Sequence, residues 1–334
     1  MIHLTVAVCL LLYLIADTAT LIRAAVSGRY DRSVSVFSPE GELQQVQYAE
    51  RAASLGAPLV CVQLNSTALL LLTPSLPREE GSLVDRRLQH KLNRVTVSSA
   101  GIGGGGGGGV WMGSAGLAGD AGALLRFARS FASDFNFKFN DFPSAAAVAH
   151  SIGDLQHATT LRGGERPYGA HALILGFGEP ETLALKPSSS LSSSASKVSA
   201  FVVRASGQVT QWRAVAIGES AEEIEAALEA SGDIEWDGKT SLALRVKRLT
   251  QLLQRIVERK RRRGASEGRG GDGDVQGVDA YLFNYDAESR DVHKLQALGL
   301  HFNEEKERSS TSIAEEGKEE EEEEEAHSIR WMPF

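Results

Sequence analysis

The chain has 334 residues, of which 42% are hydrophobic and 23% are charged, so it is long and apolar enough to bury a full core. The net charge is −8, but much of it lies in the last thirty residues, where Glu319–Glu325 is a run of glutamates; the near-neutral body argues against bulk nucleic-acid binding. Two cysteines, Cys9 and Cys61, with no C-x-x-C motif, exclude a disulfide framework and indicate a reducing compartment.

The first feature in chain order is an apolar stretch over residues 2–22, which is about long enough to span a bilayer. Asp17 lies inside it and no Lys or Arg precedes it, so it is an imperfect signal peptide. Three interpretations stay open: a membrane anchor or signal, an additional helix, or a gene-model artefact with no counterpart in the working protein. Membrane association is therefore an open question at this point.

The stretch from Arg29 to Ala53 predicts a strand, a turn and a helix. Residues 33–37 alternate polar and apolar side chains, which favours a short half-buried strand. Ser38–Gly41 is typical of a turn, because proline presets φ at its second position and glycine accepts a positive φ near its end. A helix is expected from Glu42, with Gly56 as a stop signal.

Two apolar runs follow, over residues 59–64 and 67–72, and the short turn between them predicts a hairpin with both faces covered. Residues 73–82 are polar and rich in proline, which indicates a loop. Lys91 lies just before an expected strand at 95–97. On the residues alone, Lys91 is an exposed lysine on a polar loop.

Residues 103–109 are a run of seven glycines, which is typical of a flexible insertion because glycine has maximal backbone freedom and no side chain to pack. No Gly-Lys-Ser/Thr follows, so a phosphate loop is not supported. Ser114 lacks the first glycine of a nucleophile elbow, which argues against a serine hydrolase. His150 and His157 share a helix face without a third ligand, so no metal site is expected.

The remaining elements come from apolar periodicity and turn signals. Helices are expected from Gly116 to about Phe135 and at 144–157, 221–230 and 241–263. Strands are expected at 172–177, 199–203, 208–211 and 278–283, the last as the closing strand. Residues 181–197 are rich in serine and predict a disordered loop. This order of strands and helices favours an α+β fold of two stacked sheets between helical layers.

Three motifs carry a family resemblance. Tyr30-Asp31-Arg32, followed by Phe37-Ser38-Pro39-x-Gly41-x-Leu43 and Gln45-Val46-x-Tyr48-Ala49, resembles the N-terminal signature of proteasome α-type subunits. Gly116-Leu117-x-x-Asp120-Ala121 and Gly163-Gly164-x-Arg166-Pro167-Tyr168-Gly169 resemble two later motifs of the same family. One departure is Arg204–Gly207, where α-type subunits have Asp-Pro-x-Gly.

The resemblance covers about Arg29–Phe302 and implies the four-layer αββα sandwich of N-terminal-nucleophile hydrolases. It divides the chain into a hydrophobic extension at 1–28, an α-type domain at 29–302 with flexible insertions at 101–109 and 181–198, and an acidic disordered tail at 303–334. The family also implies a site of action in the cytoplasm and nucleus, with no cofactor.

The resemblance implies a structural function. Seven α-type subunits form a ring whose N-terminal segments gate substrate entry in ubiquitin-dependent protein degradation. By position, the gate residues are Tyr30, Asp31, Arg32, Pro39 and Tyr48. Lys91 occupies the position of the lysine that receives the C-terminal carboxylate of activator tails. Implied partners are other proteasome α and β subunits, regulatory particles or activators, and unfolded protein in transit, with no nucleic acid.

Catalysis is not expected, although active relatives share the fold. Active β-type relatives expose an N-terminal threonine at the start of the first strand and use a lysine after the second. Here Gly56-Ala57-Pro58 opens the first strand, and Thr73-Pro74-Ser75 after the second contains no lysine. Two alternatives stay open: a divergent, active amidase or protease, and a membrane-anchored adaptor on the same fold.

Overall fold

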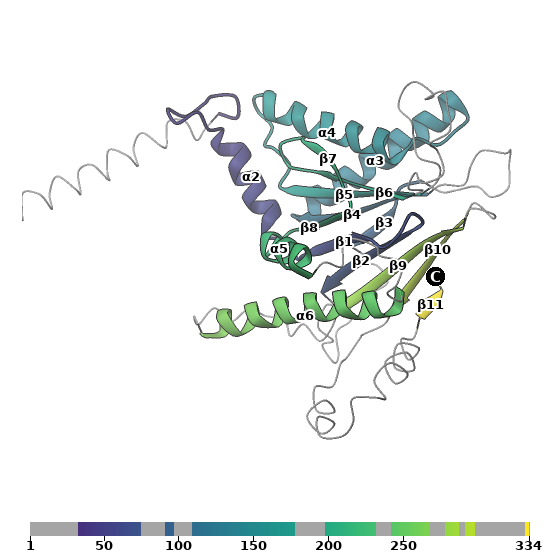
Figure 1. Cartoon of the computed structure of the whole chain (residues 1–334). Coiled ribbons are helices and arrows are strands. Elements are labelled where there is room, and N and C mark those ends of the chain that lie inside the picture. Colours follow the sequence, from purple (N-terminus) through teal and green to yellow (C-terminus); the bar gives the residue numbers. More distant parts are fainter. Residues whose placement is uncertain are drawn as a thin grey trace, which may run out of the picture.

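The computed structural model describes residues 33–74, 91–96, 109–177, 198–231, 242–266, 278–286, 291–297 and 331–333. Two antiparallel sheets stack on one another, with helices on both outer faces (Figure 1). This arrangement is the four-layer αββα sandwich expected from the sequence.

One sheet has six strands in the order β11-β10-β9-β2-β1-β8. The strands of this sheet are β1 (Leu59–Gln63), β2 (Ala68–Pro74), β8 (Ala214–Ile217), β9 (Val278–Asp286), β10 (Asp291–Ala297) and β11 (Trp331–Pro333). The β1–β2 hairpin pairs Val60 with Leu72 and Gln63 with Leu69, as the two apolar runs predicted.

The other sheet has five strands in the order β3-β4-β5-β6-β7. The strands of this sheet are β3 (Leu92–Arg94), β4 (Val110–Gly116), β5 (Ala170–Phe177), β6 (Val198–Val203) and β7 (Val209–Trp212). The β6–β7 pairing confirms the second predicted hairpin. Arg213 is the single residue between β7 and β8, so the chain crosses there from one sheet to the other.

Helices α3 (Ala118–Phe139) and α4 (Ala145–Leu161) cover the five-stranded sheet, and α5 (Ala221–Ser231) and α6 (Leu242–Ser266) cover the six-stranded one. Helix α2 (Gln44–Ser54) runs along one side of the sandwich and contacts β4 and β5 (Figure 1). Local signals set the helix ends: the Ser144 hydroxyl accepts the Ala147 backbone N–H at the start of α4, and Asn140 ends α3 in a left-handed conformation.

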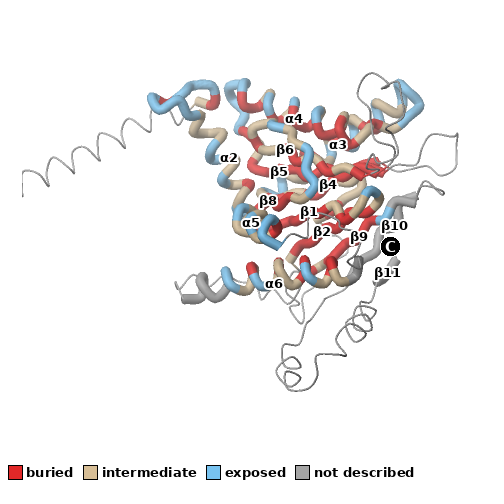
Figure 2. The backbone as a smooth tube through the Cα atoms, in the orientation of Figure 1, coloured by how far each residue is buried: buried red, intermediate tan, exposed pale blue. Residues whose placement is uncertain are grey.

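The central strands β1, β2 and β5 are buried on both faces because each sheet lies between two layers (Figure 2). In β1, Leu59 and Cys61 point toward the opposite sheet, whereas Val60 and Val62 pack under α5 and α6. Burial raises the pKa of the Cys61 thiol to about 12, so this cysteine is an inert core residue.

Four sequence expectations need correction. Residues 33–37 form a turn and irregular backbone in place of a strand, and the strand expected at 95–97 lies at 92–94. Strand β9 does not close the sheet, because β10 and β11 follow it. Residues 331–333 of the predicted disordered tail form β11 and pair with β10, which the sequence did not signal because the strand is three residues long.

The predicted N-terminal extension, the two predicted insertions and most of the acidic tail lie outside the part of the chain that the structure describes. These are residues 1–32, nearly all of 101–109 and 181–198, and residues 303–330. Of the helices that are described, none has both the length and the apolar character needed to cross a membrane.

Candidate functional site

The candidate site begins with the turn that leads into α2. The Gly41 backbone N–H donates to Ser38 O at 2.8 Å, and Ser38 N–H donates to Glu42 O at 2.9 Å. The Ser38 hydroxyl also accepts from Glu42 N–H at 3.2 Å. Gly41 has φ +82°, which glycine adopts without strain. These bonds hold Pro39 at the exposed tip of a closed turn.

The five predicted gate residues divide into two groups. Tyr30, Asp31 and Arg32 lie outside the described residues. Pro39 lies exposed at the tip of the turn, and Tyr48 is 51% exposed on α2. Two of the five residues are therefore exposed, and the grouping of all five stays a prediction.

Glu50 ties α2 to the five-stranded sheet. Its Oε2 lies 2.7 Å from His171 Nε2 on β5, and its Oε1 accepts the Ser206 backbone N–H at 2.9 Å. Burial alone would raise the pKa of Glu50, but the contacts with His171 and Ser206 outweigh it and leave that pKa below its ordinary value. The pair lies beside a groove of about 530 Å³ that Phe37, Leu43 and Val46 also line.

Sequence reasoning missed this tie. Glu50 belongs to the signature helix and His171 interrupts an otherwise apolar strand, so a buried histidine in need of a partner was the available signal. The partner itself lies 121 residues away in the chain, which no local pattern reveals.

The connection from α2 to β1 packs closely on the rest of the fold at Gly56 and Pro58. Gly56 lies so close to Gly116 that a Cβ at position 56 would overlap the Gly116 backbone nitrogen. Gly56 O accepts from Glu219 N–H at 2.7 Å. The Thr73 hydroxyl donates to Pro58 O at 3.2 Å from the neighbouring strand. Helix α2 thus passes directly into β1, and Ala57 and Pro58, at its start, carry no hydroxyl, thiol or free amine.

Lys91 reaches this same point. Its Nζ donates to Ala57 O at 2.8 Å, and burial lowers the pKa of the amine to about 8. The sequence expectation concerned Thr73-Pro74-Ser75, which contain no lysine. The lysine that contacts the start of β1 lies just before β3 instead. An ammonium has three N–H donors, so the bond to Ala57 leaves two for another acceptor.

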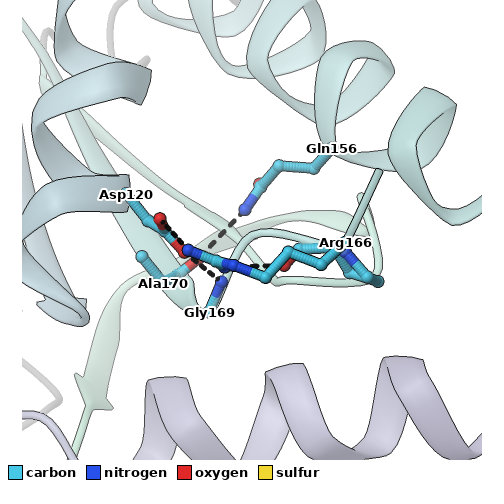
Figure 3. A network of polar contacts seen from close by, with 6 residues as sticks. Asp120, Gln156, Arg166, Gly169 and Ala170 are labelled. Carbon is cyan, nitrogen blue, oxygen red and sulfur yellow. Dashed lines mark hydrogen bonds and ion pairs between the residues drawn. The ribbon is translucent and has the colours of Figure 1, made fainter. Parts of the chain in front are cut away.

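A second polar contact joins the two later motifs. Arg166 donates from both terminal nitrogens to Asp120, at 2.6 Å to Oδ2 and 2.7 Å to Oδ1, and Gly169 N–H donates to Oδ2 at 2.8 Å. The hydrogen bonds from Arg166 hold the pKa of Asp120 below its usual value. Gln156 of α4 points toward the same turn and donates to Ala170 O at 2.9 Å (Figure 3).

Other candidate chemistry finds no support in the described part of the chain. There, no three His, Cys, Asp or Glu side chains gather as metal ligands would, and His150 and His157 lack a third partner. Ser114 lies inside β4, paired with Ala172 of β5, and not on a strand-to-helix turn.

Comparisons with known proteins agree on one family. The proteasome A-type N-terminal signature matches residues 30–52, and the general proteasome family matches residues 107–196. The alpha 2 proteasome subunit of Haloferax volcanii is 30% identical over 229 residues, covering 68% of this chain and 79% of that protein. The alpha type-7-B proteasome subunit of Oryza sativa is 29% identical over 227 residues, covering 68% and 79%, and the alpha type-8 proteasome subunit of Mus musculus is 27% identical over 234 residues, covering 69% and 81%.

Proposed function

The chain belongs to the proteasome α-subunit family, and from this premise we propose that it is a non-catalytic subunit of the α-ring of a proteasome core particle. Its partners are other α and β subunits, and its task is the passage of unfolded protein into the particle during ubiquitin-dependent degradation in the cytoplasm and nucleus. Residues 29–302 form the ring-building domain in this proposal.

The main support for a non-catalytic role is the way α2 enters β1. A nucleophile of the N-terminal type needs a free amine on the first residue of β1, because that amine serves as the base. Here the chain before Ala57 is folded onto the sheets, with α2 held by Glu50 and Gly56 packed against Gly116. Freeing an amine at Ala57 would require cutting the short connection between α2 and β1, and Ala57 has no nucleophilic atom to offer.

The same geometry supports a gating role for the segment before α2. A gate needs a mobile leading segment and a fixed base against which it changes position. The closed turn at Ser38–Gly41 and the Glu50–His171 contact make α2 a fixed base. Tyr30, Asp31 and Arg32 precede this base directly, and Pro39 and Tyr48 lie on its outer surface. We assign these five residues to the gate.

Lys91 is proposed to receive the C-terminal carboxylate of an activator tail. Its amine is partly buried and fixed by Ala57 O, so it loses little side-chain freedom on binding a carboxylate. A charge-assisted hydrogen bond in a partly desolvated site is stronger than one in open water.

One observation favours a second candidate, a divergent active enzyme of the same fold. Lys91 Nζ lies at the start of β1, where a lysine would serve a nucleophile. That candidate requires cleavage of the chain to expose a Thr, Ser or Cys.

Native purification followed by mass spectrometry tests the proposal. Co-purification with other α and β subunits, with the chain retaining the signature at residues 30–52, is expected. A monomer that hydrolyses peptides, with a new N-terminal Thr, Ser or Cys, would establish the second candidate instead.

A further inference from the structure

Helix α6 is the most basic element of the fold. Its 25 residues include nine Lys or Arg and one Glu. Val246, Leu249, Leu253 and Ile256 make its buried face and pack on the six-stranded sheet. Arg245 belongs to this packing, because it is buried and donates to Leu64 O at 2.7 Å. Packing does not explain the exposed cations of the helix.

Three of the cations form a stripe on the solvent side. Arg248, Arg255 and Arg259 are exposed and lie seven and four residues apart, which places them on one face of a helix. We call these three residues the α6 stripe. Near the end of α6, Arg259 already contacts Glu223 of α5 at 3.3 Å, and the adjacent Lys260 contacts Glu219. Cations at this end of the helix therefore attract carboxylates within the fold.

The sequence contains an acidic segment of matching composition. Residues 298–330 hold twelve Glu and four Lys or Arg, with Glu319–Glu325 as their densest part. The two ends of this segment are held at one place, because Ala297 of β10 pairs with Trp331 of β11. The chain therefore leaves the sheet at the end of β10 and re-enters it beside the same strand at β11.

The edge strands that flank the acidic segment belong to the sheet that α6 covers. Val278, Ala280 and Leu282 of β9 pack in the same cluster as the buried face of α6. Strands β10 and β11 follow β9 in the sheet, so β11 lies about 10 Å from β9 at ordinary strand spacing. In the view of Figure 1, β11 stands at the sheet edge beyond one end of α6.

The distances allow the contact. Glu325 and Glu319 precede Trp331 by six and twelve residues, which is about 20 and 40 Å of extended chain. Helix α6 is about 38 Å long at 1.5 Å per residue. The glutamate run can therefore reach the α6 stripe without disturbing the β10–β11 pairing.

We propose that the acidic segment, through Glu319–Glu325, docks in cis on the α6 stripe. The segment neutralises a polycationic surface and keeps other polyanions, nucleic acids among them, away from α6. The contact is electrostatic and solvent-exposed, so salt weakens it: the screening length falls from about 8 Å at physiological salt to about 3 Å near 1 M.

Zero-length carbodiimide cross-linking of the full chain, read by mass spectrometry, tests the docking. Cross-links from Glu319–Glu325 to Lys247 and Lys260 of α6 are expected, severalfold more frequent than cross-links to Lys138, which is exposed on α3 at the opposite face. High salt should remove them. Links absent from α6, equally frequent to Lys138, or found only between molecules would overturn the proposal.

Heparin chromatography of matched variants supplies the second measurement. Changing Glu319–Glu325 to Gln should raise the salt needed for elution, whereas changing the run to Asp, which keeps the charge, should not. Because net charge alone also affects elution, the Gln variant is repeated with Arg248→Gln and Arg255→Gln. If the Gln variant no longer elutes at higher salt once Arg248 and Arg255 are replaced, the acidic run covers the α6 stripe in the unmodified protein. An unchanged increase in the elution salt would contradict the proposal.

Discussion

Arg166 holds the carboxylate of Asp120 with both terminal nitrogens, although the two residues are 46 positions apart. Asp120 lies in the first turn of α3 and Arg166 in the turn before β5, so this pair fixes the start of a helix to the start of a strand. The Asp120 side chain is 12% exposed and the Arg166 side chain 62%. Asp120 is therefore the buried partner of the pair, and Arg166 is the partner that faces solvent.

Asp120→Ala should therefore destabilise the protein more than Arg166→Ala. Removing the carboxylate leaves the buried Gly169 N–H without its acceptor, which costs about 1–3 kcal/mol. Removing the exposed guanidinium leaves a carboxylate that Gly169 still bonds. Urea unfolding followed by circular dichroism gives both values, with Arg162→Ala, an exposed neighbour, as the control. Equal losses for the two variants would show that the charge pair matters more than the buried N–H.

A Gly56→Ala change should disrupt the entry to β1. The added Cβ would overlap backbone atoms of Gly116, which are held within the sandwich. We therefore expect the free energy of unfolding to fall by about 1–3 kcal/mol, or folding to be lost. Gly119→Ala is the matched control, because nothing lies within 4 Å of its Cβ and alanine favours a helix. A neutral Gly56→Ala would mean that α2 and β4 separate easily, which would weaken the argument for a fixed base under the gate.

Much of the fold follows from local patterns. The two hairpins and all five helices in the described part of the chain were predictable because their apolar periodicity and turn residues agree with the final packing. The strand predicted at 33–37 does not form, because this segment pairs with no described strand of either sheet. It leads instead into the turn at Ser38–Gly41 and then into α2. Glu50–His171 and Lys91–Ala57 were not predictable, since each pair depends on how distant strands meet.

Acid stability should depend on Glu50. Its pKa is lowered in the folded protein from an ordinary value of 4.5, so as pH falls the unfolded chain takes up the proton first. The stabilisation from Glu50 is therefore present above about pH 4.5 and is lost as pH falls through the folded-state pKa. Glu50→Gln should flatten the acid limb of a plot of unfolding free energy against pH. Glu222→Gln, exposed on α5, should leave that limb unchanged, and identical curves for both variants would exclude the Glu50 contact as a source of acid sensitivity.

Activator docking should lose strength as pH rises through about 8, because the pKa of Lys91 is lowered to about that value and only the ammonium attracts a carboxylate. In assembled particles, peptide hydrolysis stimulated by an activator with a C-terminal docking tail should therefore decline between neutral and alkaline pH. Lys91→Arg, which keeps its charge throughout, should remove this dependence, whereas Lys91→Ala should lower stimulation at every pH. Lys138→Ala on α3 controls for a general loss of positive charge. Native gels report whether the ring persists in each variant; intact Lys91→Ala particles with full stimulation would show that Lys91 serves the start of β1 alone, through its bond to Ala57.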